Sequence, residues 1–470
     1  MMGSTSISPW MIALLVILVL RSAHVAHAEE IFAEPTMTDD PFEPSLEPTE
    51  SVDPPLPTDA PILPTAAPSV APSATPEPST EPVTPTPSPT DGVGPVSCSL
   101  AVAVFGGDEV EWDLTDSSQN VIVASANTGG SLNDSVEIES GKSYLFRIKD
   151  PEAAEAFDAF VEDTDSPTLI RSTYSVSLNA NLLGDGVLFA EEFIEFEAQA
   201  DCSVTLELPT ERFKIRFIHD HSSDELERLV EQAAARWDEV IAGGVPPKQF
   251  TLRGERISVN DLLVDVQIVD DDGVGGTLAY AISPGFRGQS NQYKPYFALV
   301  GVDRSDLEDA FISGNELELY DTLLHELGHT LGLASFSWLL NDLASGPEYF
   351  GSNAVREFHR LLDEGGLPFT GCTNCVPLES SGGDGTAGSH WSEDIFGTEL
   401  MTGFADPVSD PLSRLTIGGL EDLGYDVDYS NADPFALSAS RAQGHRRPTR
   451  SNNRDLWEDL AEQTRKLKLN

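Results

Sequence analysis

The sequence predicts a multi-domain protein in which an all-β sandwich is followed by an α+β domain. Between residues 96 and 208, short β-branched or aromatic segments recur about every ten residues, separated by Gly, Asn, Asp and Ser, a rhythm typical of an antiparallel sandwich. From residue 209 to residue 432, strand-like segments are interspersed with amphipathic helical ones, which indicates a mixed domain. The length of 470 residues leaves room for both.

The first 95 residues indicate export followed by an extended stalk. The apolar run Trp10–Leu20 precedes the Ala-His-Ala of residues 26–28, a small-x-small pattern that predicts a signal peptide over residues 1–28. An uncleaved anchor is the alternative, because no Lys or Arg precedes the apolar run. Residues 29–95 are rich in Pro, Ser and Thr, which predicts a disordered stalk that is either O-glycosylated or a plain spacer.

The charge balance and the cysteines narrow the partners and the compartment. The chain has 27 Lys and Arg against 78 Asp and Glu, a formal net charge of −51, which excludes nucleic-acid binding through phosphates. No later segment predicts a stable membrane span. Four cysteines suit an oxidising compartment, and their simplest pairing joins Cys98 to Cys202 and Cys372 to Cys375. We therefore expect a secreted protein, free outside the cell or associated with its surface.

The predicted sandwich has no residue pattern that carries chemistry, so we expect it to bind or to act as a spacer. Cys98 near its first strand and Cys202 at its last would join its two ends. Asn133 begins one N-glycosylation sequon. The expected strands are 100–105, 109–116, 120–126, 135–140, 143–150, 173–180, 187–193 and 203–209.

The mixed domain begins with a predicted strand and a long predicted helix. Apolar residues at three- and four-residue spacing give the helix over 222–243 one apolar face, and Ser222 with Glu225 predicts a capping box at its start. Residues 433–470 form a basic tail on an acidic protein. The further expected elements are strands at 212–220, 262–270, 275–283 and 295–303 and helices at 316–331 and 415–428.

The stretch "HELGH" carries the strongest chemical signal. His325 and His329 lie four residues apart, so on a helix their rings leave the same face, with about 5–6 Å between Cβ atoms. Neutral imidazoles at that spacing can bind one Zn²⁺ at about 2.0–2.1 Å. Glu326 leaves the helix about 100° from His325, which suits a general base better than a ligand. The alternative is two surface histidines on an acidic helix.

A catalytic zinc has three protein ligands, so a third must be found. Many zinc peptidases place it six residues after the second histidine, but that position is Ser335. Gly332 is expected to end the helix in a left-handed conformation and to turn the chain back. The remaining candidates for the third ligand are His359, His390, His445, Glu348 and Glu357.

Three features together resemble the leishmanolysin family of metzincin peptidases. They are HExxH followed by Gly332, the distant pair His390-Trp391, and Glu-Leu-Met ending at Met401. In that family an insertion separates the second and third zinc histidines. The resemblance implies a metzincin-type catalytic domain over residues 209–432. It also implies roles for five residues: His325, His329 and His390 as ligands of one catalytic zinc, Glu326 as general base, and Met401 as the methionine under the metal.

The resemblance also implies an activity and a kind of substrate. Such an enzyme is a secreted zinc endopeptidase that hydrolyses peptide bonds by zinc-activated water, with Glu326 accepting its proton. The stretch "GGTLAYA" resembles the edge strand that pairs with an extended protein or peptide substrate. The sequence departs from the family because its catalytic region has only two cysteines, Cys372 and Cys375. The alternative function is an extracellular adhesion or binding protein with an inactive peptidase-like domain.

Two further hypotheses concern metal ions. Asp270, Asp271 and Asp272 could hold Ca²⁺, but the loop lacks EF-hand spacing, so an ordinary acidic turn is the alternative. Cys98 could act as a latency thiolate on the zinc, and its disulfide with Cys202 is the alternative.

Overall fold

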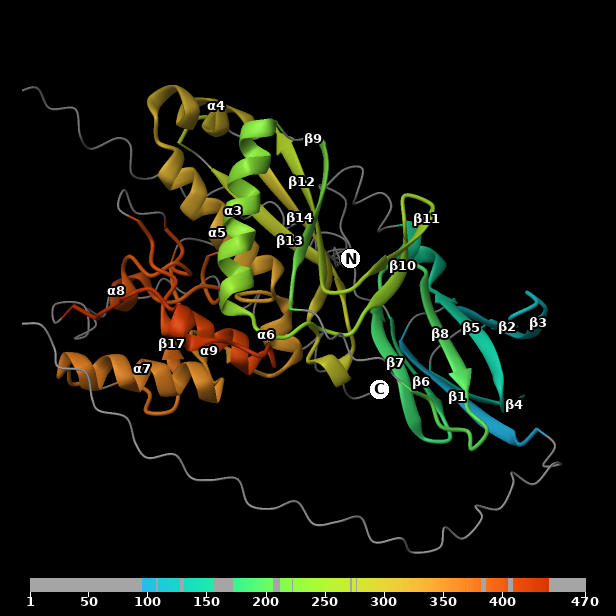
Figure 1. The fold of residues 1–470 in the computed structure, drawn as a ribbon. Helices are drawn as coiled ribbons and strands as arrows, with labels where there is room; N and C mark the ends of the chain where they lie inside the picture. The colour runs from blue at the N-terminus through green and yellow to red at the C-terminus, as the bar shows by residue number, and fades with distance from the viewer. Residues whose placement is uncertain are drawn as a thin grey trace, which may run out of the picture. The chain divides into compact units, whose positions relative to one another are not determined.

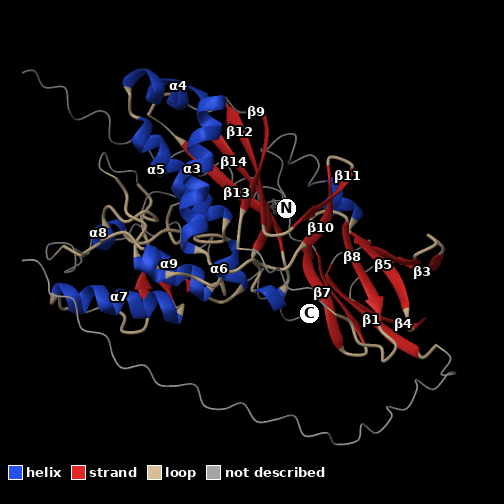
Figure 2. Cartoon of the chain, viewed as in Figure 1, coloured by secondary structure: helices blue, strands red, loops and turns tan. Residues whose placement is uncertain are grey.

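The computed structural model describes most of the chain from residue 95 to residue 438. The described ranges are 95–106, 109–126, 131–155, 172–205, 212–221, 223–270, 273–275, 277–369, 371–381, 386–404 and 409–438. The predicted signal peptide, nearly all of the stalk and most of the basic tail lie outside them. The described chain contains helices and several sheets, as expected for a multi-domain, β-rich protein (Figures 1 and 2).

Strands β1 to β8 form two sheets that share one core. One sheet has the order β4-β1-β6-β7. The other has the order β11-β10-β8-β5-β2-β3 and so includes two later strands, β10 (Lys248–Leu252) and β11 (Glu255–Val259). Val102, Trp112, Phe146 and Val176 belong to a single buried cluster to which both sheets contribute, so the two sheets pack face to face. Their bounds are Ser97–Gly106 (β1), Glu111–Asp116 (β2), Val121–Ala126 (β3), Leu132–Glu139 (β4), Lys142–Lys149 (β5), Ser172–Leu178 (β6), Asn181–Leu188 (β7) and Glu192–Ala198 (β8).

The last two strand predictions of this region were wrong. The expected strand 187–193 spans the junction between β7 and β8, and residues 203–205 lie outside any strand. The predicted strand included only the first two residues of β8, whose seven residues contain three glutamates, one of them, Glu192, fully buried. Cys202 instead lies in a turn closed by its own N–H, which donates to the Gln199 carbonyl at 2.8 Å. Both predicted disulfides, Cys98–Cys202 and Cys372–Cys375, are present.

A hairpin from later in the chain completes the six-stranded sheet. Strands β10 (Lys248–Leu252) and β11 (Glu255–Val259) pair with each other, and β10 also pairs with β8 through Phe250 and Glu192. Val187 and Phe189 of the first region share a buried cluster with Phe250 and with Tyr296. The two regions of the sequence are therefore joined by a continuous sheet and a common apolar core.

A buried ion pair lies at this junction. Lys248 Nζ is 2.5 Å from Glu192 Oε2, and the Lys248 and Glu192 side chains are 10% and 0% exposed. The hydroxyl groups of Tyr174 and Tyr296 donate to the same carboxylate at 2.5 and 3.0 Å. Burial raises the pKa of both tyrosines, which keeps them protonated as donors. The Glu192 carboxylate is thus fully engaged.

Replacement of Glu192 by alanine should strongly destabilise the protein. The change would leave the Lys248 ammonium buried without its counter-charge, which costs about 3–5 kcal/mol of unfolding free energy. Urea denaturation followed by tryptophan fluorescence would measure the loss. The matched control is Glu195→Ala on the same strand, because the Glu195 and Arg256 side chains are 60% and 33% exposed and such pairs contribute at most about 1 kcal/mol. Equal losses in the two variants would contradict the prediction.

The second region is built on a four-stranded sheet with the order β13-β14-β12-β9. Strands β9, β12 and β14 are parallel, and β13 is antiparallel at the edge. Helices α3 and α5 lie beside this sheet (Figure 1). None of the described helices is long and apolar enough to cross a membrane. The bounds are Ile215–His221 (β9), Asp224–Val240 (α3), Leu262–Val269 (β12), Ala279–Phe286 (β13), Gln289–Asn291 (η1), Pro295–Asp303 (β14), Arg304–Ser313 (α4) and Glu316–Thr330 (α5).

The start of α3 differs from the predicted capping box. Ser223, not Ser222, is the N-cap, and its side chain accepts from the Leu226 N–H at 3.2 Å. Leu226 therefore occupies the N3 position that a capping box gives to Glu or Gln. Only Ser222 fits the capping-box pattern, but the helix begins one residue later, and Leu226 is buried in the core.

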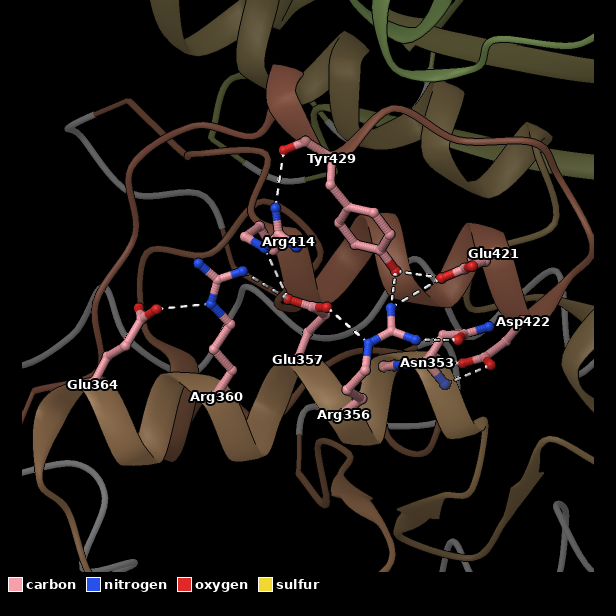
Figure 3. A network of polar contacts seen from close by, with 10 residues as sticks. Asn353, Arg356, Glu357, Arg360, Glu364, Arg414, Glu421, Asp422 and Tyr429 are labelled. Carbon is pink, nitrogen blue, oxygen red and sulfur yellow. Dashed lines mark hydrogen bonds and ion pairs between the residues drawn. The ribbon is translucent and has the colours of Figure 1, made fainter.

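Between α5 and α9 the chain forms an insertion that contains helices α6, α7 and α8 and the short strands β15, β16 and β17. Glu357 of α7 and Arg414 of α9 form an ion pair of 2.8 Å, and Arg356 of α7 also donates to Glu357 (Figure 3). The carboxylate of Asp422 accepts from the Asn353 N–H at 2.8 Å, so α9 caps the start of α7. The bounds are Phe336–Leu340 (α6), Ala344–Ser345 (β15), Glu348–Tyr349 (β16), Ser352–Gly365 (α7), Val376–Pro377 (β17), Glu393–Phe396 (α8), Arg414–Asp422 (α9) and Tyr429–Asn431 (η2).

Candidate metal centre

Helix α5 and the turn that ends it position two histidines. Gly332 has φ +101°, its N–H donates to the His329 carbonyl at 3.0 Å, and the Leu333 N–H donates to the Gly328 carbonyl at 3.2 Å. This pair of bonds is a Schellman motif, so the predicted left-handed role of Gly332 is confirmed. The turn also brings the Leu333 carbonyl to 3.1 Å from His329 Nδ1.

The third histidine comes from far along the chain. His390 lies 61 residues after His329, yet their Nε2 atoms are 3.1 Å apart. The Nε2 atom of His325 is 2.9 Å from that of His329 and 3.2 Å from that of His390. The structure therefore brings the three predicted histidines together as a group that could hold a metal ion.

The other ring nitrogen of each histidine faces a backbone carbonyl. His325 Nδ1 is 2.6 Å from the Leu400 oxygen, and His390 Nδ1 is 3.2 Å from the Thr386 oxygen. Carbonyl oxygens only accept, so each Nδ1 carries the proton, as the Leu333 carbonyl also requires of His329. The three Nε2 atoms are then unprotonated, and their lone pairs face one another.

Burial keeps these rings neutral. It lowers the pKa of His325, His329 and His390, that of His390 to about 3. Three unprotonated nitrogens in mutual contact repel one another unless a cation lies between them. Tetrahedral bonds of about 2.0–2.1 Å to one Zn²⁺ would separate the nitrogens by about 3.3 Å, close to the distances of 2.9 to 3.2 Å found here. The donor set thus fits zinc.

Glu326 is a buried carboxyl group on α5, next to His325 in the sequence. Its exposed fraction is 8%, and burial raises its pKa to about 8. Among the residues that the structure describes, none donates a hydrogen bond to its carboxylate. A buried carboxyl group without a partner among the described residues, adjacent in sequence to one of three converging histidines, is a candidate for proton exchange with a reactant.

Met401 packs beneath the histidine helix. A Cβ added at Gly328 would lie 2.7 Å from Met401 Sδ, so only glycine between the two histidines permits this contact. The preceding residue, Leu400, supplies the carbonyl that faces His325. Met401 itself accepts through its carbonyl from the N–H of Trp391, the neighbour of His390, at 2.9 Å. Leu400 and Met401 therefore contact both helix α5 and the segment that carries His390.

Glu399 begins the Glu-Leu-Met motif but received no role from the sequence, and it organises the turn that contains Met401. Glu399 is fully buried and accepts from the Met401 N–H at 2.8 Å, from Ser413 Oγ at 2.6 Å and from Thr416 Oγ1 at 2.7 Å. Thr416 Oγ1 in turn accepts from Trp391 Nε1 at 2.8 Å. The only sequence signal was a charged residue directly before Leu-Met.

The other ligand candidates have different surroundings. His359 Nε2 lies 2.7 Å from the Thr373 carbonyl, and Glu357 pairs with arginines. Glu348 lies near Cys372 and Cys375, whose sulfurs form a disulfide. None of these belongs to the histidine group.

The remaining residues named in the sequence analysis have simpler outcomes. Ser335 caps α6 by accepting from the Ser337 N–H at 3.2 Å. Asp270 pairs with Arg304 at 2.7 Å, while Asp271, Asp272 and His445 lie outside the described residues. Cys98 is bound to Cys202, so it is not a free thiolate.

Comparison with known proteins gives one match. The family model of leishmanolysin matches residues 202–443. No curated protein and no solved structure matches the chain significantly. The matched range contains all three histidines and Met401 as well as the hairpin β10–β11.

Proposed function

This chain belongs to the leishmanolysin family of metallopeptidases, and on that premise we propose that it is a secreted zinc endopeptidase. The observation that carries the proposal is the convergence of three unprotonated Nε2 atoms within 2.9 to 3.2 Å of one another. The disulfide Cys98–Cys202 supports an extracellular location.

We assign the roles as follows. His325, His329 and His390 hold the zinc, and the backbone carbonyls behind them fix the ring orientations. Bound zinc would lower the pKa of water and polarise the scissile carbonyl. The positive charge of the bound ion would favour the ionised form of Glu326 and so oppose the effect of burial on its pKa. The Glu326 carboxylate would then accept a proton from the attacking water and later donate it to the departing amine. Met401 supports the helix from below through its contact at Gly328.

The substrate is proposed to be an extended segment of a peptide or protein. Strand β13 lies at the edge of its sheet: it pairs with β14 on one side, and no other strand that the structure describes pairs with it on the other side. A peptide could therefore add to the free side by backbone hydrogen bonds. This arrangement supports a metzincin-type catalytic domain, to which we assign residues 209–432. The sandwich domain over 96–208, the stalk over 29–95 and the signal peptide over 1–28 are proposed from the sequence.

Removal of the metal tests the proposal. Dialysis against a chelator should abolish cleavage of a mixture of fluorogenic peptides, and addition of equimolar Zn²⁺ should restore it, because the ion would activate the attacking water and polarise the scissile carbonyl. Elemental analysis of the purified protein should find about one zinc per chain. Cleavage that persists without zinc would contradict the proposal, as would stoichiometric zinc with no cleavage of any peptide.

A further inference from the structure

The sandwich contacts the turn that joins the edge strand β13 to β14. Asp185, on β7, accepts through Oδ2 from the Ser290 N–H at 2.9 Å and through Oδ1 from Ser290 Oγ at 2.5 Å. A Cβ added at Gly288 would lie 2.2 Å from Asp185 Cγ, so glycine is required for the carboxylate to reach the turn. Asp185 thus caps η1 from a strand 105 residues earlier in the chain.

The start of the same turn is also fixed. Arg287 forms an antiparallel bridge with Gly186, the residue after Asp185. Its guanidinium is buried at 2% exposure and donates to backbone carbonyls only. The acceptors are the carbonyl oxygens of Pro246, Pro295, Asn260 and Asp261. The end of β13 is therefore anchored between the sandwich and the sheet.

The far side of the turn faces the chain that leaves the metal helix. Ser337 Oγ donates to the Tyr293 carbonyl at 2.8 Å, and Asn341 Nδ2 donates to the Gln292 carbonyl at 2.6 Å. Ser337 belongs to α6, which follows the Gly332 turn, and a Cβ added at Gly332 would lie 2.9 Å from Ser337 Oγ. The turn of residues 287–294 thus lies between the sandwich and the segment that holds His329.

Strand β13 needs such support because its own pairing is irregular. Its register with β14 shifts between Ile282 and Gly285 and again between Gly285 and Phe286. Pro284, within the first shift, has no N–H to donate. Hydrogen bonds to β14 therefore hold the C-terminal half of β13 less completely than its first half.

We infer that Asp185 is a positioning residue of the peptidase, which holds the turn 287–294 and thereby the substrate-pairing edge of β13. The sandwich is then a working part of the substrate site, in addition to any spacing role. The inference rests on the proposed function, because it concerns the strand to which an extended peptide would add. Weakening this support should reduce binding of long peptides, which use the strand edge, more than it affects the metal.

The kinetic test compares Asp185→Ala with matched variants. For a peptide of about ten residues, Asp185→Ala should raise KM about tenfold, because two hydrogen bonds to a charged acceptor are lost, and leave kcat and zinc content unchanged. Gly288→Ala should reproduce this effect, and Asp185→Asn, which can still accept from Ser290, should restore most of the affinity. Asp201→Ala is the control, since Asp201 accepts from the N–H and Oγ of Ser203 in another sandwich turn. A tetrapeptide substrate should show little change in KM.

A readout independent of activity separates the two proposals. Hydrogen–deuterium exchange of residues 279–294 should be faster in Asp185→Ala than in the wild type and unchanged in Asp201→Ala. Unchanged exchange in Asp185→Ala would overturn the inference, as would a loss that is equal for long and short peptides. If the wild-type protein cleaved no peptide, the proposed function would fail, and the exchange measurement alone would decide whether Asp185 holds the strand.

Discussion

Glu326→Ala should lower kcat/KM for peptide cleavage by about 10²–10⁴-fold, the contribution typical of a positioned general acid–base group, and leave zinc binding at the wild-type level. The carboxylate is buried at 8% exposure and lies outside the group of three histidines. Its removal therefore deprives the attacking water of a proton acceptor without removing a ligand. Steady-state assays on a fluorogenic peptide and elemental analysis of the same sample would measure both quantities.

The matched control is Glu316→Ala, at the start of the same helix. Glu316 pairs with Arg228 at the surface, where both side chains are nearly half exposed, so its loss should change activity by less than about twofold. Glu326→Gln is the sharper variant, because it keeps the size of the side chain but cannot accept the proton. Activity near the wild-type level in Glu326→Gln would remove Glu326 from the proposed role.

Features set by short stretches of sequence were predicted well. Helix α5 and its Gly332 terminus follow from apolar spacing and from the one residue that tolerates positive φ at no cost. Strands β12 and β14 are rich in β-branched and other apolar residues and coincide closely with the predicted segments. In each case the information lies within about fifteen residues.

Features that depend on distant contacts were not predicted from the sequence. Glu192 occupies a core position of β8 only because Lys248 and two tyrosines meet it there, and the hairpin β10–β11 joins that sheet across more than 50 residues. Glu399 likewise gains its role from Ser413 and Thr416. Buried charges with long-range partners violate local patterns, so a pattern of neighbouring residues does not predict them.

The third histidine is an intermediate case. The residue at the usual spacing is Ser335, which left His359, His390, His445, Glu348 and Glu357 as candidates, and only the resemblance to leishmanolysins favoured His390. The structure brings His390 to helix α5 through backbone hydrogen bonds on both sides of it. The His390 carbonyl accepts from the Glu379 N–H at 2.8 Å, and the Trp391 N–H donates to the Met401 carbonyl at 2.9 Å. That arrangement makes His390 the most informative ligand to remove.

His390→Ala should abolish both zinc binding and peptide cleavage. With His325 and His329 alone, the site has two protein ligands where catalytic zinc requires three. Loss of an outer partner of a ligand costs about 10–100-fold in metal affinity, so loss of the ligand itself should exceed about 100-fold. Competition with a fluorescent zinc chelator would measure the affinity. The double loss contrasts with Glu326→Ala, in which cleavage fails and zinc stays bound.

The control for this variant is His359→Ala, on helix α7 in the insertion between His329 and His390. His359 contacts only the Thr373 carbonyl through its Nε2, and it lies outside the histidine group, so zinc affinity should stay at the wild-type value. A zinc affinity of His390→Ala within tenfold of the wild type would show that the ion is held without this imidazole. The assignment of the metal centre would then be wrong, and with it the mechanism built on three converging Nε2 atoms.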